Sequence, residues 1–142
     1  PIGDLEWAFI ARKGSGIQLS SLEDARSLDI IGTYKDDVRE QFLIEQGFTN
    51  LDSCTDVNTL MLKLIRGRTD IVILDMPGAV AIVKELGFDS IELEKLLVVD
   101  STPLYCSFSR ETPDQVIEDW QKTLDGMKTD GTFETIEEKW LK

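Results

Sequence analysis

The chain has 142 residues, of which 42% are hydrophobic, and a net charge of −12. This length allows one domain with a real core, and the negative charge repels phosphate backbones, so we expect no nucleic-acid partner. There is no histidine, which removes the commonest metal ligand and neutral-pH acid or base. Cys54 and Cys106 lack C-x-x-C spacing, so we expect no metal and no cofactor; a disulfide between them and two free thiols both remain open.

No apolar run approaches the roughly 20 residues that a membrane helix needs. The chain does not begin with a basic segment followed by an apolar one, so any signal peptide lies outside it.

The first half of the chain alternates short strands with helices. The helices begin at capping patterns, and the second of them ends at a glycine. The expected elements are a strand at 5–12, a helix from Ser20-x-x-Glu23 to about 28, a strand at 30–33, a helix from Asp37-x-x-Glu40 to Gly47, and a brief strand at 48–51.

In the second half, the clearest helix begins at Thr55 or Asp56, carries an apolar stripe at helical spacing and ends at Gly67. Four uninterrupted apolar residues at 71–74 then indicate a central parallel strand that is covered on both faces. The other expected elements are a helix at 77–86 closed by Gly87, strands at 96–99 and 103–108, and a last helix from about Thr132. Between them, Thr112-Pro113-Asp114-Gln115 begins a further helix, with Thr112 as the N-cap and Pro113 at the first helical position.

This order predicts an α/β fold with a mostly parallel sheet and helices on both of its faces. The two successive amphipathic helices at the end break the alternation and need an apolar surface to cover.

Several segments, taken together, resemble the second half of a family 3 extracytoplasmic (periplasmic) solute-binding protein of the polar amino-acid ABC-transporter type. The resemblance covers roughly residues 5 to 141. Its segments are Ser20 to Leu28, Ile31-Gly32 with Asp37-x-x-Glu40, Leu64-x-x-Gly67-Arg68-x-Asp70 through Asp75, and Leu124 through Gly131-Thr132-Phe133 to Lys139-Trp140.

The resemblance implies a type II periplasmic-binding-protein-like lobe, in which residues 1–108 form the second, ligand-binding lobe with its crossing strands. Residues 109–142 would be C-terminal helices that pack on the first lobe, most of which is missing here. Without that lobe, an apolar patch around Trp120, Leu124, Phe133 and Trp140 would need another cover. A homodimer, with or without domain swapping, is one way to bury it.

The loop that follows the strand at 30–33 matches the family's ligand loop. The family uses glycine and hydroxyl residues there to receive a carboxylate at a helix N-terminus, whereas this sequence has Asp36, Asp37 and Val38. Asp37 could cap the helix itself, or one of the two aspartates could meet a cationic or hydroxyl-rich ligand. Lys35 and Arg39 flank the loop as ligand contacts or as solvated surface charges.

Asp75 follows the buried strand at the carboxyl edge of the sheet, where open α/β sheets bind ligands. The resemblance makes it the ammonium-binding aspartate, although a helix cap is the alternative. Thr33 and Tyr34 complete the expected ligand-binding set, with Tyr34 either stacking on the ligand or packing at the rim. Thr55 and Asp56 are expected to be caps, and Arg110 to lie on the surface.

The resemblance implies a non-catalytic protein that binds an amino acid or another small polar solute outside the cytoplasm and delivers it to an ABC-transporter permease. No catalytic triad, G-x-S-x-G or phosphate loop is present, so we expect no enzyme. A receptor's extracytoplasmic sensor domain and a lyase-like enzyme on the same fold remain alternatives. No linker follows the last expected helix, which favours a free-standing binding protein over a sensor.

Overall fold

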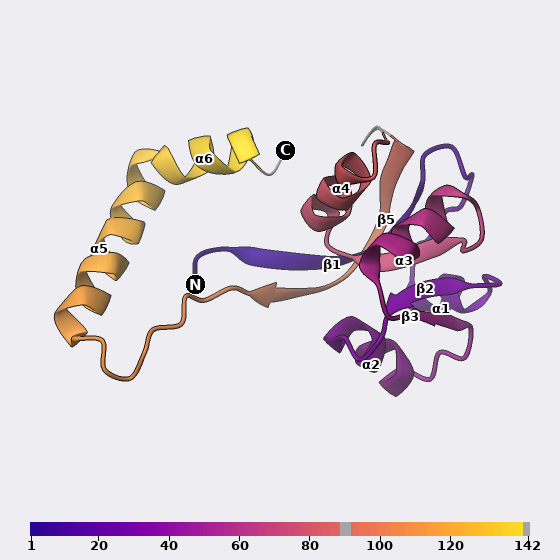
Figure 1. Ribbon diagram of the computed structural model, residues 1–142, viewed down its shortest axis with the longest axis horizontal. Helices are drawn as coiled ribbons and strands as arrows, with labels where there is room; N and C mark the ends of the chain where they lie inside the picture. The colour runs from indigo at the N-terminus through magenta and orange to yellow at the C-terminus, as the bar shows by residue number, and fades with distance from the viewer. Residues whose placement is uncertain (89–91, 141–142) are drawn as a thin grey trace. The chain divides into compact units, whose positions relative to one another are not determined.

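The computed structural model describes residues 1–88 and 92–140 (Figure 1). The chain divides into two compact units. One unit, Leu5–Thr102, is here called the sheet unit, and residues 1–4 together with those from 103 onward form the helical unit. Within the described residues, no helix has both the length and the apolar character needed to span a bilayer.

The strands of the described residues form one sheet in the order β3-β2-β4-β1-β5. Strand β2 (Ile31–Tyr34) runs parallel to both β3 (Leu51–Cys54) and β4 (Ile71–Leu74). Strand β1 (Asp4–Arg12) pairs antiparallel with β4, and β5 (Leu93–Pro103) lies beside β1. The α/β fold class is confirmed, and the parallel part of the sheet is β3-β2-β4.

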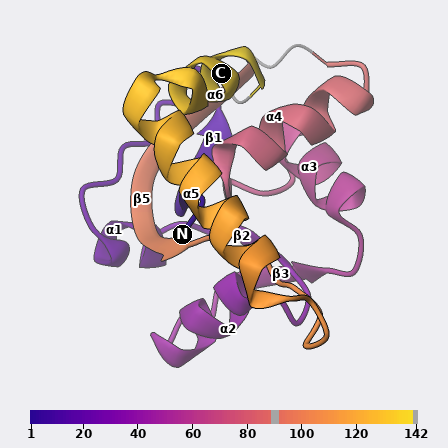
Figure 2. The same ribbon diagram turned by 90° about the vertical axis from the view of Figure 1, so that its left-hand side faces the viewer.

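Both faces of β4 are buried, as its apolar run predicts. On one face, Val72 and Leu74 join a core with α3 (Val57–Ile65) and α4 (Met76–Glu85), which lie next to each other in Figure 2. On the other face, Ile71 and Ile73 join a core with α1 (Leu22–Arg26) and α2 (Val38–Glu45). Successive strand residues point to opposite faces, so four consecutive apolar residues supply two cores.

Helix ends in the sheet unit follow the expected glycines. Gly47, Gly67 and Gly87 each have a positive φ directly after a helix C-cap, the left-handed conformation that glycine adopts without steric cost. One cap prediction is wrong by one residue, because the capping box of α1 pairs Ser21 with Asp24 instead of Ser20 with Glu23.

Two strand predictions are wrong. The strand expected at 48–51 is shifted to β3, because Phe48 is a buried core residue after the end of α2. The strand expected at 96–99 lies within the longer β5, but the strand expected at 103–108 is absent, because β5 ends at Pro103 and residues 104–108 have no strand structure. Local residue preference does not reveal this, since pairing along β1 decides how far β5 continues.

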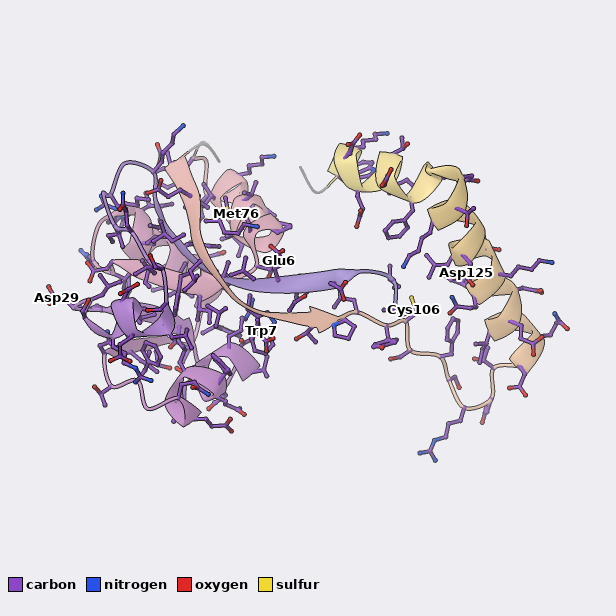
Figure 3. The ribbon with its side chains drawn as sticks, turned by 180° about the vertical axis from the view of Figure 1, so that it is seen from behind. Glu6, Trp7, Asp29, Met76, Cys106 and Asp125 are labelled. Carbon is purple, nitrogen blue, oxygen red and sulfur yellow. The ribbon has the colours of Figure 1, made fainter. Side chains whose placement is uncertain are left out.

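The helical unit contains α5 (Asp114–Asp130) and α6 (Thr132–Trp140), which are joined at Gly131 in the left-handed conformation. Helix α5 has no side-chain cap: Pro113 stands at the N-cap position, so the expected Thr112 cap is wrong. Neither helix contains a buried residue. Cys106, labelled in Figure 3, is exposed and precedes α5, whereas Cys54 is buried, and both are free thiols.

Candidate functional site

Three helices of the sheet unit begin where the parallel strands end. Helix α2 follows β2, α3 follows β3 and α4 follows β4. An aspartate caps each helix: Asp37 accepts from Arg39 N, Asp56 from Thr59 N and Asp75 from Gly78 N. Because neighbouring parallel strands end at the same edge, these caps gather there, at the edge where open α/β sheets bind ligands.

Arg39 joins two of these caps. Its Nε donates to Asp37 Oδ1 at 2.7 Å, and its Nη2 donates to Asp37 Oδ2 at 3.1 Å. Its Nη1 donates to Asp75 Oδ2 at 3.2 Å. The three side chains are only 15–20% exposed, so the pairing is well shielded from water. The ends of β2 and β4 therefore meet at one cluster of two carboxylates and one guanidinium.

The cluster is charged at neutral pH. Burial raises the pKa of Asp37, but the side-chain and backbone hydrogen bonds from Arg39, together with its charge, outweigh burial and hold that pKa below its ordinary value. Burial also lowers the pKa of Arg39, but Asp37 and Asp75 outweigh it and raise that pKa. One net negative charge remains when these three groups are ionised.

Asp75 makes the closest approach to a helix in the cluster. Its Oδ1 accepts from Gly78 N at 2.7 Å, while its Oδ2 faces Arg39. A Cβ atom on Gly78 would lie 2.7 Å from Asp75 Oδ1, which is closer than real Cβ contacts. Glycine at this position therefore allows the carboxylate to sit directly over the first turn of α4, where Met76 is the first residue (Figure 3).

The loop between β2 and α2 is held by Glu40. This side chain is buried, its Oε1 accepts from Thr33 Oγ1 at 2.6 Å and its Oε2 accepts from Asp36 N at 2.8 Å. The expected capping box is therefore only half correct, because Glu40 accepts the N–H of Asp36 and not that of the cap residue Asp37. Burial raises the pKa of Glu40, but hydrogen bonds from Ser53, Thr33 and Asp36 and the charge of Lys35 outweigh it, so the pKa lies below its ordinary value.

The expected ligand-binding residues occupy different environments. Asp37, Arg39 and Asp75 form the cluster, and Thr33 is fully buried beneath the loop. Tyr34, Asp36 and Val38 are exposed. The capping alternative is confirmed for Asp37 and for Asp75, which each cap a helix. Each of the two carboxylates also forms an ion pair with Arg39.

Two features of the site could not be assigned from the sequence. One is the bridging of Arg39 to Asp75, which needs strands β2 and β4 to be neighbours. The other is the contact of Glu40 with Thr33 and Asp36, for which the Asp37-x-x-Glu40 pattern was a partial signal. Asp56, also at this edge, is a cap as expected.

A separate hollow lies in the helical unit and is lined mainly by apolar side chains. Phe108 and Trp120 meet edge to face in its wall, with ring centroids 5.9 Å apart. Trp120 is 58% exposed, so this face is uncovered. Its lining includes Ile2, Tyr105, Phe108, Ile117, Trp120, Leu124, Met127, Phe133 and Ile136. This composition fits contact with another apolar surface better than binding of a polar solute.

Comparison with solved structures identifies the fold as periplasmic-binding-protein-like. The second substrate-binding domain of an amino-acid ABC transporter from Streptococcus pneumoniae has a TM-score of 0.75, is 18% identical, and is matched over 99% of this chain and 62% of its own. A binding component of an ABC transporter from Wolinella succinogenes, complexed with lysine, has a TM-score of 0.72 and 21% identity over 99% of this chain and 60% of its own.

A third similar structure is an ancestral arginine-binding protein bound to arginine, with a TM-score of 0.66 and 25% identity over 100% of this chain and 62% of its own. Other matches are a histidine kinase sensor domain, 18% identical, and an ancestral amino-acid-binding protein described as a precursor of cyclohexadienyl dehydratase, 19% identical. No family model and no curated sequence matches this chain.

The chain spans about three fifths of the length of these structures. What it shares with amino-acid-binding and ABC-transporter substrate-binding proteins is therefore a fold over part of their length.

Proposed function

We propose that this chain supplies a ligand-binding lobe for an amino acid or another small polar solute. The ligand binds at the carboxyl edge of β2 and β4, against Asp37, Arg39 and Asp75. The observation that carries the proposal is the Arg39 bridge, which brings charged groups from two strand–helix junctions together at that edge.

The ligands of proteins that share this fold also support the proposal. Structures that share the fold include proteins in complex with lysine and with arginine, which are 21% and 25% identical to this chain. Both of those ligands carry an α-ammonium group. The cluster has one net negative charge, so an ammonium group is its electrostatic complement. Asp75 is the proposed acceptor, because its position matches the family's ammonium-binding aspartate.

The test is an NMR titration of the ¹⁵N-labelled chain with amino acids, polyamines and small carboxylates at millimolar concentration. Chemical-shift changes are expected for the amides of Thr33–Arg39 and of Asp75, Met76 and Gly78 when the solute carries an ammonium group. High concentrations are needed because the chain supplies only part of the length of its structural neighbours. If none of the solutes moves these resonances, the proposed site is refuted.

Asp75→Asn is the informative variant, because the amide keeps the size of the carboxylate and removes its charge. It should weaken the response to ammonium solutes. Asp56→Asn is the matched control, since Asp56 is also a helix cap at this edge but does not contact Arg39. An equal loss in both variants would show that capping, and not ligand contact, explains the effect.

The wider role follows from the same resemblance. We infer an extracytoplasmic protein that delivers its solute to the permease of an ABC transporter, with residues 1–108 as the binding lobe and 109–142 as helices that cover a first lobe. A pull-down of the permease by the full-length protein, increased by the solute, tests this role.

Two other functions have some support. A histidine kinase sensor domain shares the fold, so the lobe could report a solute instead of transporting it. Deleting the gene should then abolish a solute-dependent transcriptional response and leave uptake unchanged. An enzyme is supported only by the dehydratase precursor. The lowered pKa of Asp37 makes it a poor acid or base near neutral pH. Chemical conversion of a bound solute by the protein would be the evidence for an enzyme.

The apolar face of the helical unit supports a homodimer of this 142-residue chain. Trp120 is more than half exposed and lies beside Phe108 in the wall of the hollow, and large exposed apolar side chains gathered on one face indicate a contact surface. A second copy would present the same face.

A further inference from the structure

We propose that Glu40 is a positioning residue that holds the loop between β2 and α2 in its ligand-binding shape. The proposal rests on the proposed function, because the loop needs a defined shape only if a ligand meets it. Glu40 itself does not reach the ligand, since it is only 6% exposed.

The geometry ties both ends of the loop to one carboxylate. Oε1 accepts from the hydroxyl of Thr33, which lies one residue before the end of β2. Oε2 accepts from the backbone N–H of Asp36, in the loop. The carboxylate itself comes from the first turn of α2. Strand, loop and helix are thereby joined at one buried group.

Asp36 is the residue that needs this support. Its φ is 61°, and it is the one non-glycine residue with positive φ in the described part of the chain. A left-handed conformation costs an L-residue roughly 1–2 kcal/mol, although aspartate tolerates it better than most. The hydrogen bond from Asp36 N to Glu40 is available in this conformation and offsets that cost.

An ordinary capping box does not account for the contact. In a capping box, the side chain at the third helical position accepts the N–H of the cap residue. Here the N–H of the cap residue Asp37 donates to Tyr34 O at 3.2 Å, and Glu40 accepts the N–H one residue earlier. The arrangement thus acts on the loop that precedes the helix.

The conformation of the Asp36 turn also affects the cluster of Asp37, Arg39 and Asp75. The turn at Asp36 sets where α2 begins, and the first turn of α2 carries both Asp37 and Arg39. If the turn at Asp36 opens, Asp37 loses its place as cap and the bridge to Asp75 is disturbed. Glu40 would therefore control ligand affinity through the position of Asp37 and Arg39.

The first experiment measures hydrogen exchange of the Asp36 amide by NMR on the ligand-free chain. Glu40→Leu fills the same buried space but accepts no hydrogen bond, so exchange at Asp36 should accelerate at least about tenfold. Glu40→Gln should stay close to wild type, because its carbonyl can accept from Asp36 N and its amide can donate to Thr33 Oγ1. Glu45→Gln, on the exposed side of the same helix, is the control for lost charge. An unchanged Asp36 amide in Glu40→Leu would overturn the proposal.

The second experiment separates loop support from core packing. Asp36→Gly removes the steric cost of the left-handed turn. It should raise the urea midpoint of Glu40→Leu more than it raises that of wild type. Additive midpoints would mean that Glu40 only fills space. If Glu40→Leu does not fold, Glu40→Asp replaces it, because the shorter side chain cannot reach both partners.

Neither measurement needs a ligand, so their failure refutes the role of Glu40 and leaves the proposed function standing. If exchange changes as expected and no solute binds, Glu40 holds the loop but the proposed function fails.

Discussion

Arg39 Nη1 donates to Asp75 Oδ2 at 3.2 Å, although 36 residues separate the two in sequence. This contact links the start of α2 to the start of α4 through side chains that are 15% and 19% exposed. Asp37 shares the same guanidinium, so the two capping aspartates have one counter-charge between them. These ion pairs join the carboxyl ends of β2 and β4 into a single electrostatic unit.

Arg39→Gln should destabilise the sheet unit by about 1–3 kcal/mol, because it leaves two shielded carboxylates without their counter-charge. Urea unfolding followed by circular dichroism measures the change. Arg68→Gln removes the same charge from an exposed position and should change stability by less than about 0.5 kcal/mol. Equal effects for the two variants would mean that the bridge does not stabilise the fold.

The Asp37–Arg39 pair should make stability depend on pH in acid. The pKa of Asp37 is lower in the folded chain than its ordinary value of 3.8, so its contribution is complete well above pH 3.8 and is lost as the pH falls through the folded value. The stability difference between wild type and Asp37→Asn should therefore be constant near pH 6–7 and shrink below about pH 4.

Urea unfolding at a series of pH values checks this. The same comparison in an Arg39→Gln background is the control, because the main hydrogen-bond partner is then absent. A difference that grows as the pH falls would contradict the sign of the shift.

Gly32→Ala should destabilise the sheet unit by about 1–3 kcal/mol through overpacking. A Cβ atom at Gly32 would lie 2.6 Å from Leu60 Cδ1 and 3.1 Å from Val72 Cγ1, which both belong to the core that packs α3 and α4 against the sheet. Thermal or urea unfolding measures the loss. Gly126→Ala in α5 is the matched control, since nothing lies within 4 Å of its added Cβ, and it should not destabilise. If Gly32→Ala leaves the free energy of unfolding unchanged, the core around Leu60 and Val72 can rearrange to accept the added methyl group.

The homodimer proposal predicts a molecular mass near twice 16.0 kDa in sedimentation equilibrium at micromolar concentration. Ile117→Lys together with Trp120→Lys places two charges on the apolar face of the helical unit and should yield a monomer with unchanged helix content. Val98→Lys, which charges an exposed apolar residue of β5 in the sheet unit, is the control and should remain dimeric. A monomeric wild type would end this proposal.

Much of the sheet unit could be predicted from local patterns. The apolar run of β4, the stripe of α3 and the glycines at 47, 67 and 87 each reflect a constraint within a few residues, and the structure confirms them. Strand ends were less predictable. Pairing with a neighbouring strand, and not local preference, determines that β3 begins at Leu51 and that β5 reaches Pro103.

In the candidate site, too, some features could be predicted from local sequence and others depend on the fold. Helix capping by Asp37 and Asp75 could be predicted from the sequence as one of two roles, the other being ligand contact, because a cap depends on the first turn of its own helix. The sharing of one arginine by both caps appears only in the folded chain, because it requires β2 and β4 to be neighbours. The contact of Glu40 with Asp36 N depends on the left-handed turn at Asp36, which residue spacing does not reveal. A helix cap can be inferred from residue spacing, whereas a shared counter-charge across 36 residues requires the fold.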